Sequence, residues 1–275
     1  MPIHDELGTR MKEFYESVPK TKLMRRTPVA IRIDGKAFHT FTRGFSKPFD
    51  DVLISAMQDT MKYLCENIQG CVLGYTQSDE ITLILVDYKR LNSSAWFDYE
   101  VQKMCSIAAS MATMAFNKAF TEGVQHRNLS YYAAHAILDN PHPQDDLGQT
   151  YAVKAQTGAM FDARCFNIPK EEVTNLVYWR QLDATRNSIQ MVGQANFSHK
   201  ELQGKSCEKI KEMLIAEKGI SWEDLHPMYK HGSCCIKVTT ETDGVTRSSW
   251  EIDKNIPLFV GEGREYIESL IQCEE

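Results

Sequence analysis

Residues 28–35 read Pro-Val-Ala-Ile-Arg-Ile-Asp-Gly, and the architecture of the N-terminal half follows from this segment. The apolar side chains of Val29, Ile31 and Ile33 alternate with smaller or polar neighbours, and a glycine follows. Alternation with a period of two is typical of a strand whose two faces meet different environments, and Gly35 favours a turn. The segment therefore predicts a β-strand that ends in an acidic side chain beside a glycine.

The next fifty residues predict one helix and two further strands. Apolar residues recur at helical spacing over residues 50–67, which indicates a helix with one buried face. A strand over 71–76, a polar turn over 77–79 and a nearly all-apolar strand over 81–86 complete the series. The order strand, helix, strand, turn, strand fits a split βαβ unit, in which the first and third strands are neighbours.

The rest of the chain alternates between helical and extended patterns. It predicts helices over 99–120, 171–192 and 206–219, strands over 131–138 and 160–167, and a hairpin of 233–240 with 245–251. Residues 139–157 are rich in Pro, Gln, Asp and Gly and predict a long surface loop. The expected fold class is α+β in three parts: a sheet-and-helix domain over 1–138, the loop 139–157, and a part over 158–275 that completes the sheet and adds helices.

Two carboxylates at the ends of predicted strands form the most informative pair in the sequence. Asp34 closes the first strand beside Gly35, and Asp79 lies in the turn between the second and third strands. If the first and third strands are neighbours, both carboxylates reach one edge of the sheet. Two carboxylates with a backbone carbonyl suit Mg²⁺, and two such ions about 3.5–4 Å apart catalyse phosphoryl transfer. Ordinary turns carry the same residues, so spacing alone leaves both interpretations open.

Cationic and aromatic side chains alternate directly after this first strand. Four groups that can bind phosphate stand within a short segment, namely Lys36, His39, Arg43 and Lys47. Three phenylalanines are interleaved with them, namely Phe38, Phe41 and Phe45. Aromatic rings in such a position either stack on a base or join the hydrophobic core. The segment is a candidate nucleotide-binding loop.

Composition narrows the function class and the compartment. The 275 residues carry 31 Lys and Arg against 37 Asp and Glu, for a net charge of −6. A strongly basic nucleic-acid binder is therefore excluded, and any nucleic-acid contact must come from a local patch. No apolar run approaches the ~18 residues of a membrane span, and the N-terminal residues lack a secretory pattern. Eight cysteines without C-x-x-C spacing indicate reduced thiols, so we expect a cytoplasmic protein with no membrane partner.

Several blocks, in a fixed order, resemble the signature blocks of the tRNA-histidine guanylyltransferase superfamily. The first are Arg32-Ile33-Asp34-Gly35-Lys36-Ala37-Phe38-His39, Phe45-Ser46-Lys47-Pro48 and Tyr75-Thr76-Gln77-Ser78-Asp79-Glu80. The others are Trp96-Phe97 with Lys103 and Ser106, Phe161-Asp162-Ala163-Arg164, Trp179-Arg180-Gln181-Leu182-Asp183, and Pro227-Met228-Tyr229-Lys230 with Gly232. The resemblance spans about residues 28–236, and such an ordered series is far more specific than a pair of acids.

The resemblance implies a polymerase-palm-like, ferredoxin-like domain with an antiparallel sheet, helices on one face and a mainly helical C-terminal part with a β-hairpin. The implied enzyme is a Mg²⁺-dependent nucleotidyltransferase that adds nucleotides to the 5′ end of tRNA in the 3′-to-5′ direction. ATP first activates that end as an adenylylated or triphosphorylated group. The 3′-hydroxyl of an incoming nucleoside triphosphate, GTP or another, then attacks it and expels the activating group. A homotetramer is also implied, in which tRNA crosses subunits.

The resemblance also assigns roles to individual residues. Asp34 and Asp79 match the metal-binding carboxylates, with the carbonyl of Gly35 as a further ligand. The nucleotide-contacting loop corresponds to Lys36, Ala37, Phe38 and His39, together with Ser78. Arg32 and the catalytic Lys47 match positions that stabilise phosphate charge. Lys103, Asn187 and Lys209 are implied as further nucleotide contacts.

One block departs from the family pattern. Members dedicated to histidine tRNA carry His-Ile-Asn-Asn after the Trp-Arg-Gln segment, whereas residues 183–188 here read Asp-Ala-Thr-Arg-Asn-Ser. Only Asn187 keeps an asparagine of that block. The chain thus resembles the guanylyltransferase-like branch of bacteria and archaea, which implies template-directed repair of 5′-truncated tRNA, with G addition to histidine tRNA as a further activity.

Two other function classes remain open. In a palm-type nucleotide cyclase the 3′-hydroxyl attacks its own α-phosphate, so nucleoside triphosphate alone suffices and RNA is not needed. A tRNA-binding protein with a vestigial palm site binds RNA without Mg²⁺ and turns over no nucleotide. For any tRNA-binding class, the net charge of −6 predicts weak, salt-sensitive binding that depends on local cations and on assembly.

Overall fold

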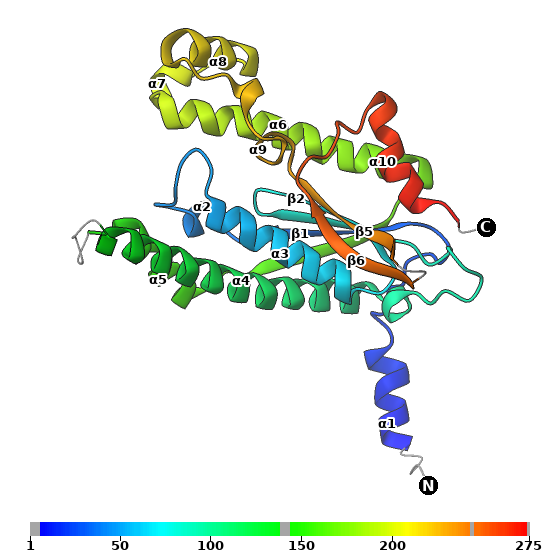
Figure 1. Cartoon of the computed structure of the whole chain (residues 1–275). Coiled ribbons are helices and arrows are strands. Elements are labelled where there is room, and N and C mark those ends of the chain that lie inside the picture. Colours follow the sequence, from blue (N-terminus) through cyan, green and yellow to red (C-terminus); the bar gives the residue numbers. More distant parts are fainter. Residues whose placement is uncertain (1–5, 138–143, 243–244, 274–275) are drawn as a thin grey trace.

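One antiparallel sheet organises the chain. The structure is a computed structural model that describes residues 6–137, 144–242 and 245–273. Within these residues the strand order is β4-β1-β3-β2-β5-β6, and every neighbouring pair is antiparallel (Figure 1). The strands are β1 (Val29–Gly35), β2 (Cys71–Gln77), β3 (Glu80–Leu85), β4 (Phe161–Asn167), β5 (Ser233–Thr242) and β6 (Val245–Asp253).

Helices lie over both faces of the sheet. In Figure 1, α3 and α4 lie against one face, and α6 and α10 lie on the other side. The α-helices are α1 (Glu6–Met11), α2 (Phe38–Phe41), α3 (Asp51–Asn67), α4 (Val101–Ile137), α5 (Asp146–Thr157), α6 (Val173–Asn196), α7 (His199–Leu202), α8 (Cys207–Met213), α9 (Pro227–His231) and α10 (Glu265–Glu268). No helix in the described parts is long and apolar enough to cross a membrane.

The alternation in β1 assigns its residues to the two faces. Ile31 and Ile33 are fully buried in the core formed with α3 and α4, whereas Ala30 belongs to the core on the α6 and α10 side. Because side chains alternate along a strand, Arg32 and Asp34 share the side of Ala30. The sheet face below α6 therefore changes from apolar to charged toward the end of β1.

The predicted fold class, α+β with an antiparallel sheet and an added helical C-terminal part, is confirmed. Strands from beyond residue 158 extend both edges of the sheet, with β4 beside β1 and β5 beside β2. The C-terminal half of α6 packs instead against α8, through Val192 and Ile210 among others. This third core joins α8 to the part of α6 that extends beyond the sheet core.

Two sequence predictions are wrong where α4 and α5 lie. The strand expected over 131–138 is the last part of α4, in which Arg127 lies over the ring of Tyr131, 4.5 Å from its centroid. The loop expected over 139–157 contains α5, which begins after the N-cap Asp145 and buries Tyr151. Tertiary packing and a helix cap therefore outweigh the polar, Gly-containing composition. Residues 138–143 lie outside the described parts.

Candidate active site

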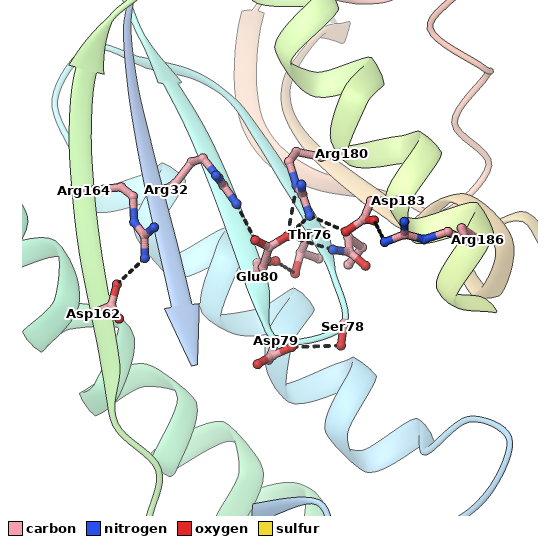
Figure 2. Close-up of polar contacts among 11 residues, drawn as sticks. Arg32, Thr76, Ser78, Asp79, Glu80, Asp162, Arg164, Arg180, Asp183 and Arg186 are labelled. Carbon is pink, nitrogen blue, oxygen red and sulfur yellow. Dashed lines mark hydrogen bonds and ion pairs between the residues drawn. The ribbon is translucent and has the colours of Figure 1, made fainter. Parts of the chain in front are cut away.

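The two predicted acidic residues meet at one end of the sheet, because β1 and β3 are neighbours as expected. Asp34 lies opposite Glu80 in the antiparallel register, and Asp79 precedes Glu80 in the tight turn after β2. The backbone N–H of Gly35 donates to the carbonyl of Asp79 over 3.1 Å, which joins the two segments directly. Ser78 takes up a positive φ of 51° in this turn, and its hydroxyl donates to the Asp79 carboxylate at 2.9 Å. Figure 2 shows this turn beside the end of β1.

Burial and like charge disfavour the ionised form of both carboxyl groups. The pKa of Asp34 is raised by burial first, and then by the charges of Glu80 and Asp162. Burial also raises the pKa of Asp79, with a contribution from the charge of Asp34, while the Ser78 hydroxyl opposes this effect. The site thus concentrates negative charge that a cation would compensate.

The ligand types at this edge fit a hard divalent cation. The carboxylates of Asp34 and Asp79 and the backbone carbonyl of Gly35 are oxygen donors, which Mg²⁺ prefers, and such sites complete their coordination with water and phosphate. In the described residues no group of three or more His, Cys, Asp or Glu side chains forms a dedicated metal cage.

Glu80 is the hub of an ion-pair network that sequence reasoning did not assign (Figure 2). Arg32 donates to its Oε1 at 2.5 Å, and Arg180 of α6 donates to its Oε2 through Nη2 at 2.6 Å and Nε at 3.0 Å. Arg180 also pairs with Asp183 at 2.7 Å. The network fixes Arg32 on the same face as Asp34 and attaches α6 to the sheet. The only sequence signal was that these residues belong to the family-like blocks.

The block that departs from the family pattern lies on α6 beside this network. Asp183 accepts from Arg186 as well as from Arg180, and the hydroxyl of Thr185 lies 3.0 Å from Nδ1 of His231. Ser188 accepts a 2.9 Å hydrogen bond from the indole N–H of Trp222, inside the core shared with α8. The residues that depart from the family pattern thus make contacts within this chain.

The candidate nucleotide loop forms a small pocket beside Asp79. The pocket is lined by Gly35, Ala37, Phe38, His39, Thr42, Leu53, Ser78 and Asp79. Lys36 and His39 are exposed. The phenylalanine rings join the core rather than offering a free stacking surface, because Phe38 packs on Phe41, Phe116 and Phe161 at centroid distances of 5.1–5.5 Å. A Cβ on Gly35 would lie 2.2 Å from the Phe38 ring, so the close approach requires glycine.

A second cavity adjoins this pocket and shares Thr42, Leu53 and Ser78 with it. It brings together Lys47 from the loop before α3 and Asn187 from α6, 140 positions apart in the sequence. The cavity walls mix apolar and polar groups, as nucleotide sites commonly do. The two adjoining hollows thus bring together Asp79, Lys47, Ser78 and Asn187, and Asp34 precedes Gly35, which lines the first of them.

The loop that carries Lys47 is held by a buried hydrogen-bond centre. Asp50 caps α3 by accepting from the N–H of Leu53 at 3.0 Å, and it accepts from the N–H of Ser46 at 2.9 Å. The hydroxyl of Tyr151 donates to the same carboxylate at 2.5 Å. Helix α5, which the sequence predicts as a loop, therefore supports the wall of the second cavity.

Lys103 and Lys209 lie apart from these hollows. Lys103 belongs to the first turn of α4, on the opposite face of the sheet from Asp34, with its ammonium 5.3 Å from the Phe97 centroid. Lys209 lies on α8, where it pairs with Glu212 at 2.8 Å and lines a separate, shallow hollow. Within one described chain, neither residue lines the pockets beside Asp79.

Comparisons with known proteins agree on one family. A family model described as tRNAHis guanylyltransferase matches residues 8–169. A solved bacterial tRNA(His) guanylyltransferase-like protein in complex with ATP is 39% identical, with a TM-score of 0.77 over 97% of this chain and 99% of that chain. The corresponding complex with GTP gives 36% identity and a TM-score of 0.75 over the same shares. An uncharacterized protein of Acanthamoeba polyphaga mimivirus is 29% identical over 90% of this chain and 82% of its own length.

Proposed function

The chain belongs to the tRNAHis guanylyltransferase family, and on that premise we propose that it is a nucleotidyltransferase that extends the 5′ end of tRNA in the 3′-to-5′ direction. The observation that carries the proposal is the convergence of Asp34 and Asp79 beside two adjoining hollows that contain Lys47, Ser78 and Asn187. Solved relatives bind ATP and GTP, so nucleoside triphosphates are the proposed occupants.

In the proposed reaction, an oxygen of the RNA 5′-monophosphate first attacks ATP. Attack at the α-phosphorus breaks the α–β bond, releases pyrophosphate and leaves an adenylylated end; attack at the β-phosphorus breaks the same bond, releases AMP and leaves a triphosphorylated end. The 3′-hydroxyl oxygen of the incoming nucleoside triphosphate then forms a bond to the 5′-terminal phosphorus. The bond from that phosphorus to the activating group breaks, and AMP or pyrophosphate leaves. The new 5′ end carries a triphosphate, and the hydroxyl proton passes to solvent or a nearby base.

Asp34, Asp79 and the carbonyl of Gly35 would hold Mg²⁺, which supplies charge neutralisation for the phosphates and lowers the pKa of the attacking hydroxyl. The chain's own groups do the remaining work. Lys47 and Arg32 place cationic groups where phosphate charge develops. The loop of Lys36, Ala37, Phe38 and His39, with Ser78, orients the nucleotide. Lys103 and Lys209 are proposed to contact triphosphate or RNA across subunits of a homotetramer, since one chain does not bring them to the site.

The block of α6 that departs from the family pattern supports template-directed nucleotide addition over obligatory addition of G. Members dedicated to histidine tRNA resemble one another in a His-Ile-Asn-Asn block at these positions. Here Thr185 contacts His231 of α9, Arg186 pairs with Asp183 of α6, and Ser188 accepts from Trp222. We therefore propose repair of 5′-truncated tRNA, in which the base opposite the vacant position selects the nucleotide.

The test uses a 5′-truncated, monophosphorylated tRNA with ATP, the four nucleoside triphosphates and Mg²⁺. The expected result is 5′ extension that Asp79→Ala abolishes and that changes nucleotide when the opposing acceptor-strand base is changed. Absence of extension by the unmodified protein would overturn the proposal. Cyclic nucleotide formed without RNA would identify a cyclase, and RNA binding without turnover would identify a vestigial site.

A further inference from the structure

An exposed tryptophan lies on the charged face of the sheet, outside both hollows. Trp179 of α6 exposes 52% of its surface, although the two residues that follow it in the family-like block, Arg180 and Gln181, are buried. The guanidinium of Arg180 lies 4.4 Å from its ring centroid, and that of Arg32 lies 5.3 Å away. The ring is therefore held in place without being covered.

The contacts of these two arginines show which side of the indole is open. Both guanidiniums donate to the carboxylate of Glu80 on β3, so both lie between the ring and the sheet. About half of the side chain remains accessible, which matches one free face of a planar ring. Leu182, one helical turn further, is 50% exposed and extends the apolar surface.

Trp179 lies on the other side of the carboxylate of Asp34 from the nucleotide pocket. Arg32 precedes Asp34 by two strand positions, about 7 Å along β1, in the direction away from the nucleotide loop. The cavity residues of α6 begin at Ala184 and continue to Gln194, so Trp179 lies more than one helical turn before them. The acidic edge therefore lies between the nucleotide hollows and the indole.

We propose that the free face of Trp179 is a stacking platform for the terminal base of the RNA 5′ end. The inference rests on the proposed function, in which two substrates must meet at the carboxylates. An in-line displacement needs its attacking and leaving groups on opposite sides of the phosphorus, and the hollows already provide for one nucleotide. Base–aromatic stacking tolerates any base, as the end of an acceptor stem of varied sequence requires.

The cations around the ring fit an RNA end. Arg164 lies opposite Arg32 in the pairing of β4 with β1, and its side chain is 56% exposed. Guanidinium groups beside a stacking ring bind the phosphates that accompany the base, and they strengthen the face by cation–π attraction. Arg164, which also pairs with Asp162 at 3.1 Å, thus adds an exposed cation on the strand next to Arg32.

The test compares Trp179→Leu and Trp179→Phe with Tyr132→Leu, which removes an exposed ring (47%) on α4 that lines neither hollow. The substrate is an acceptor-stem RNA hairpin lacking its first 5′ nucleotide. We expect Trp179→Leu to raise the KM for the hairpin roughly 5- to 150-fold, the range for one stacked base. The KM for ATP should stay unchanged, Trp179→Phe should lie near the unmodified protein, and Tyr132→Leu should have no effect. An unchanged hairpin KM in Trp179→Leu, or a raised nucleotide KM alone, overturns the proposal.

A second measurement needs no turnover. The same hairpin, with 2-aminopurine at its 5′ terminus, is titrated with protein in the absence of Mg²⁺ and triphosphates. Stacking should quench the fluorophore with the unmodified protein and with Trp179→Phe, and not with Trp179→Leu. Equal quenching by all three overturns the platform. If the unmodified protein quenches but never extends RNA, the proposed function fails while the platform stands, so the two failures are distinguishable.

Discussion

Glu80 stands directly opposite Asp34 in the antiparallel pairing of β3 with β1, and their carboxylates share one face of the sheet. The two acids have different partners. Glu80 is neutralised by Arg32 and Arg180, whereas the pKa of Asp34 is raised by burial and by the charges of Glu80 and Asp162. The network thus leaves Asp34 as the carboxylate that needs a cation.

Replacing Glu80 by Gln should weaken both the fold and the site. Arg180 is only 7% exposed at its side chain, so the loss of its charged partner leaves a poorly compensated buried cation. We expect a loss of about 1–3 kcal/mol in the free energy of unfolding, with reduced extension because Arg32 is released. Urea titration and the extension assay measure the two effects. The control Arg186→Gln removes an exposed pair with Asp183 and should cost less than about 0.5 kcal/mol; equal losses would contradict the assignment.

Tyr151→Phe should test whether α5 supports the Lys47 loop, because it changes none of the residues that are proposed to take part in the reaction. The variant keeps the ring and removes the hydroxyl that donates to Asp50 at 2.5 Å. A hydrogen bond to a buried charged group contributes about 1.5–3 kcal/mol, so thermal stability should fall, and a looser loop should raise the KM for nucleotide more than it lowers kcat. Tyr131→Phe, whose hydroxyl donates to an exposed carbonyl of Gln144 at 3.1 Å, is the matched control. Similar kinetics in both variants would count against a role for α5 in the site.

The carboxylate of Asp145 should make the free energy of unfolding depend on pH. Its pKa is lowered chiefly by the hydrogen bond from Arg127, with help from the Gly148 N–H that it caps. A lowered folded pKa means that the stabilisation is complete above the ordinary value of 3.8 and is lost as the pH falls through the lower folded value. Asp145→Asn keeps a capping side chain but loses the ion pair. The stability difference between the two proteins, measured by urea titration from pH 7 to 3, should be constant at neutral pH and shrink below about pH 4; a difference that is the same at every pH would refute this account.

Gly232→Ala should be more destabilising than Gly204→Ala, although both glycines have positive φ, +83° and +73°. A backbone with positive φ costs an L-residue roughly 1–3 kcal/mol. Gly232, with a ψ of −164°, occupies a region that is essentially confined to glycine. At position 232 the new Cβ would also lie 2.5 Å from the carbonyl oxygen of Thr76, whereas at 204 nothing lies within 4 Å. Overpacking adds roughly 1–3 kcal/mol. Because Gly232 and Thr76 both line the second cavity, a raised nucleotide KM should accompany the loss of stability. Equal melting temperatures for the two variants would contradict the contact.

The strands of the N-terminal half could be read from the sequence because each has a clear local signal. The alternation in residues 29–34 and the apolar run in 81–86 predict β1 and β3, and the turn after β2 follows from polar residues. The predictions for the end of α4 and for α5 are wrong because these helices lack a clear local signal. Their helicity depends on Arg127 over Tyr131, on the Asp145 cap and on the burial of Tyr151. Composition over a short window does not contain those contacts.

The sequence by itself determined the family, the fold class and the acidic pair Asp34 and Asp79, because these depend on local periodicity and on ordered blocks. Only the tertiary structure decided which residues act together. The strand order places Glu80 beside Asp34, and α6 brings Arg180, Asn187 and Trp179 to the sheet from 100 or more positions away. It also separates Lys103 and Lys209 from the pockets of one chain. The physical reason is that ion pairs, stacking and cavities form between side chains close in space, and long-range packing of helices on the sheet determines that closeness.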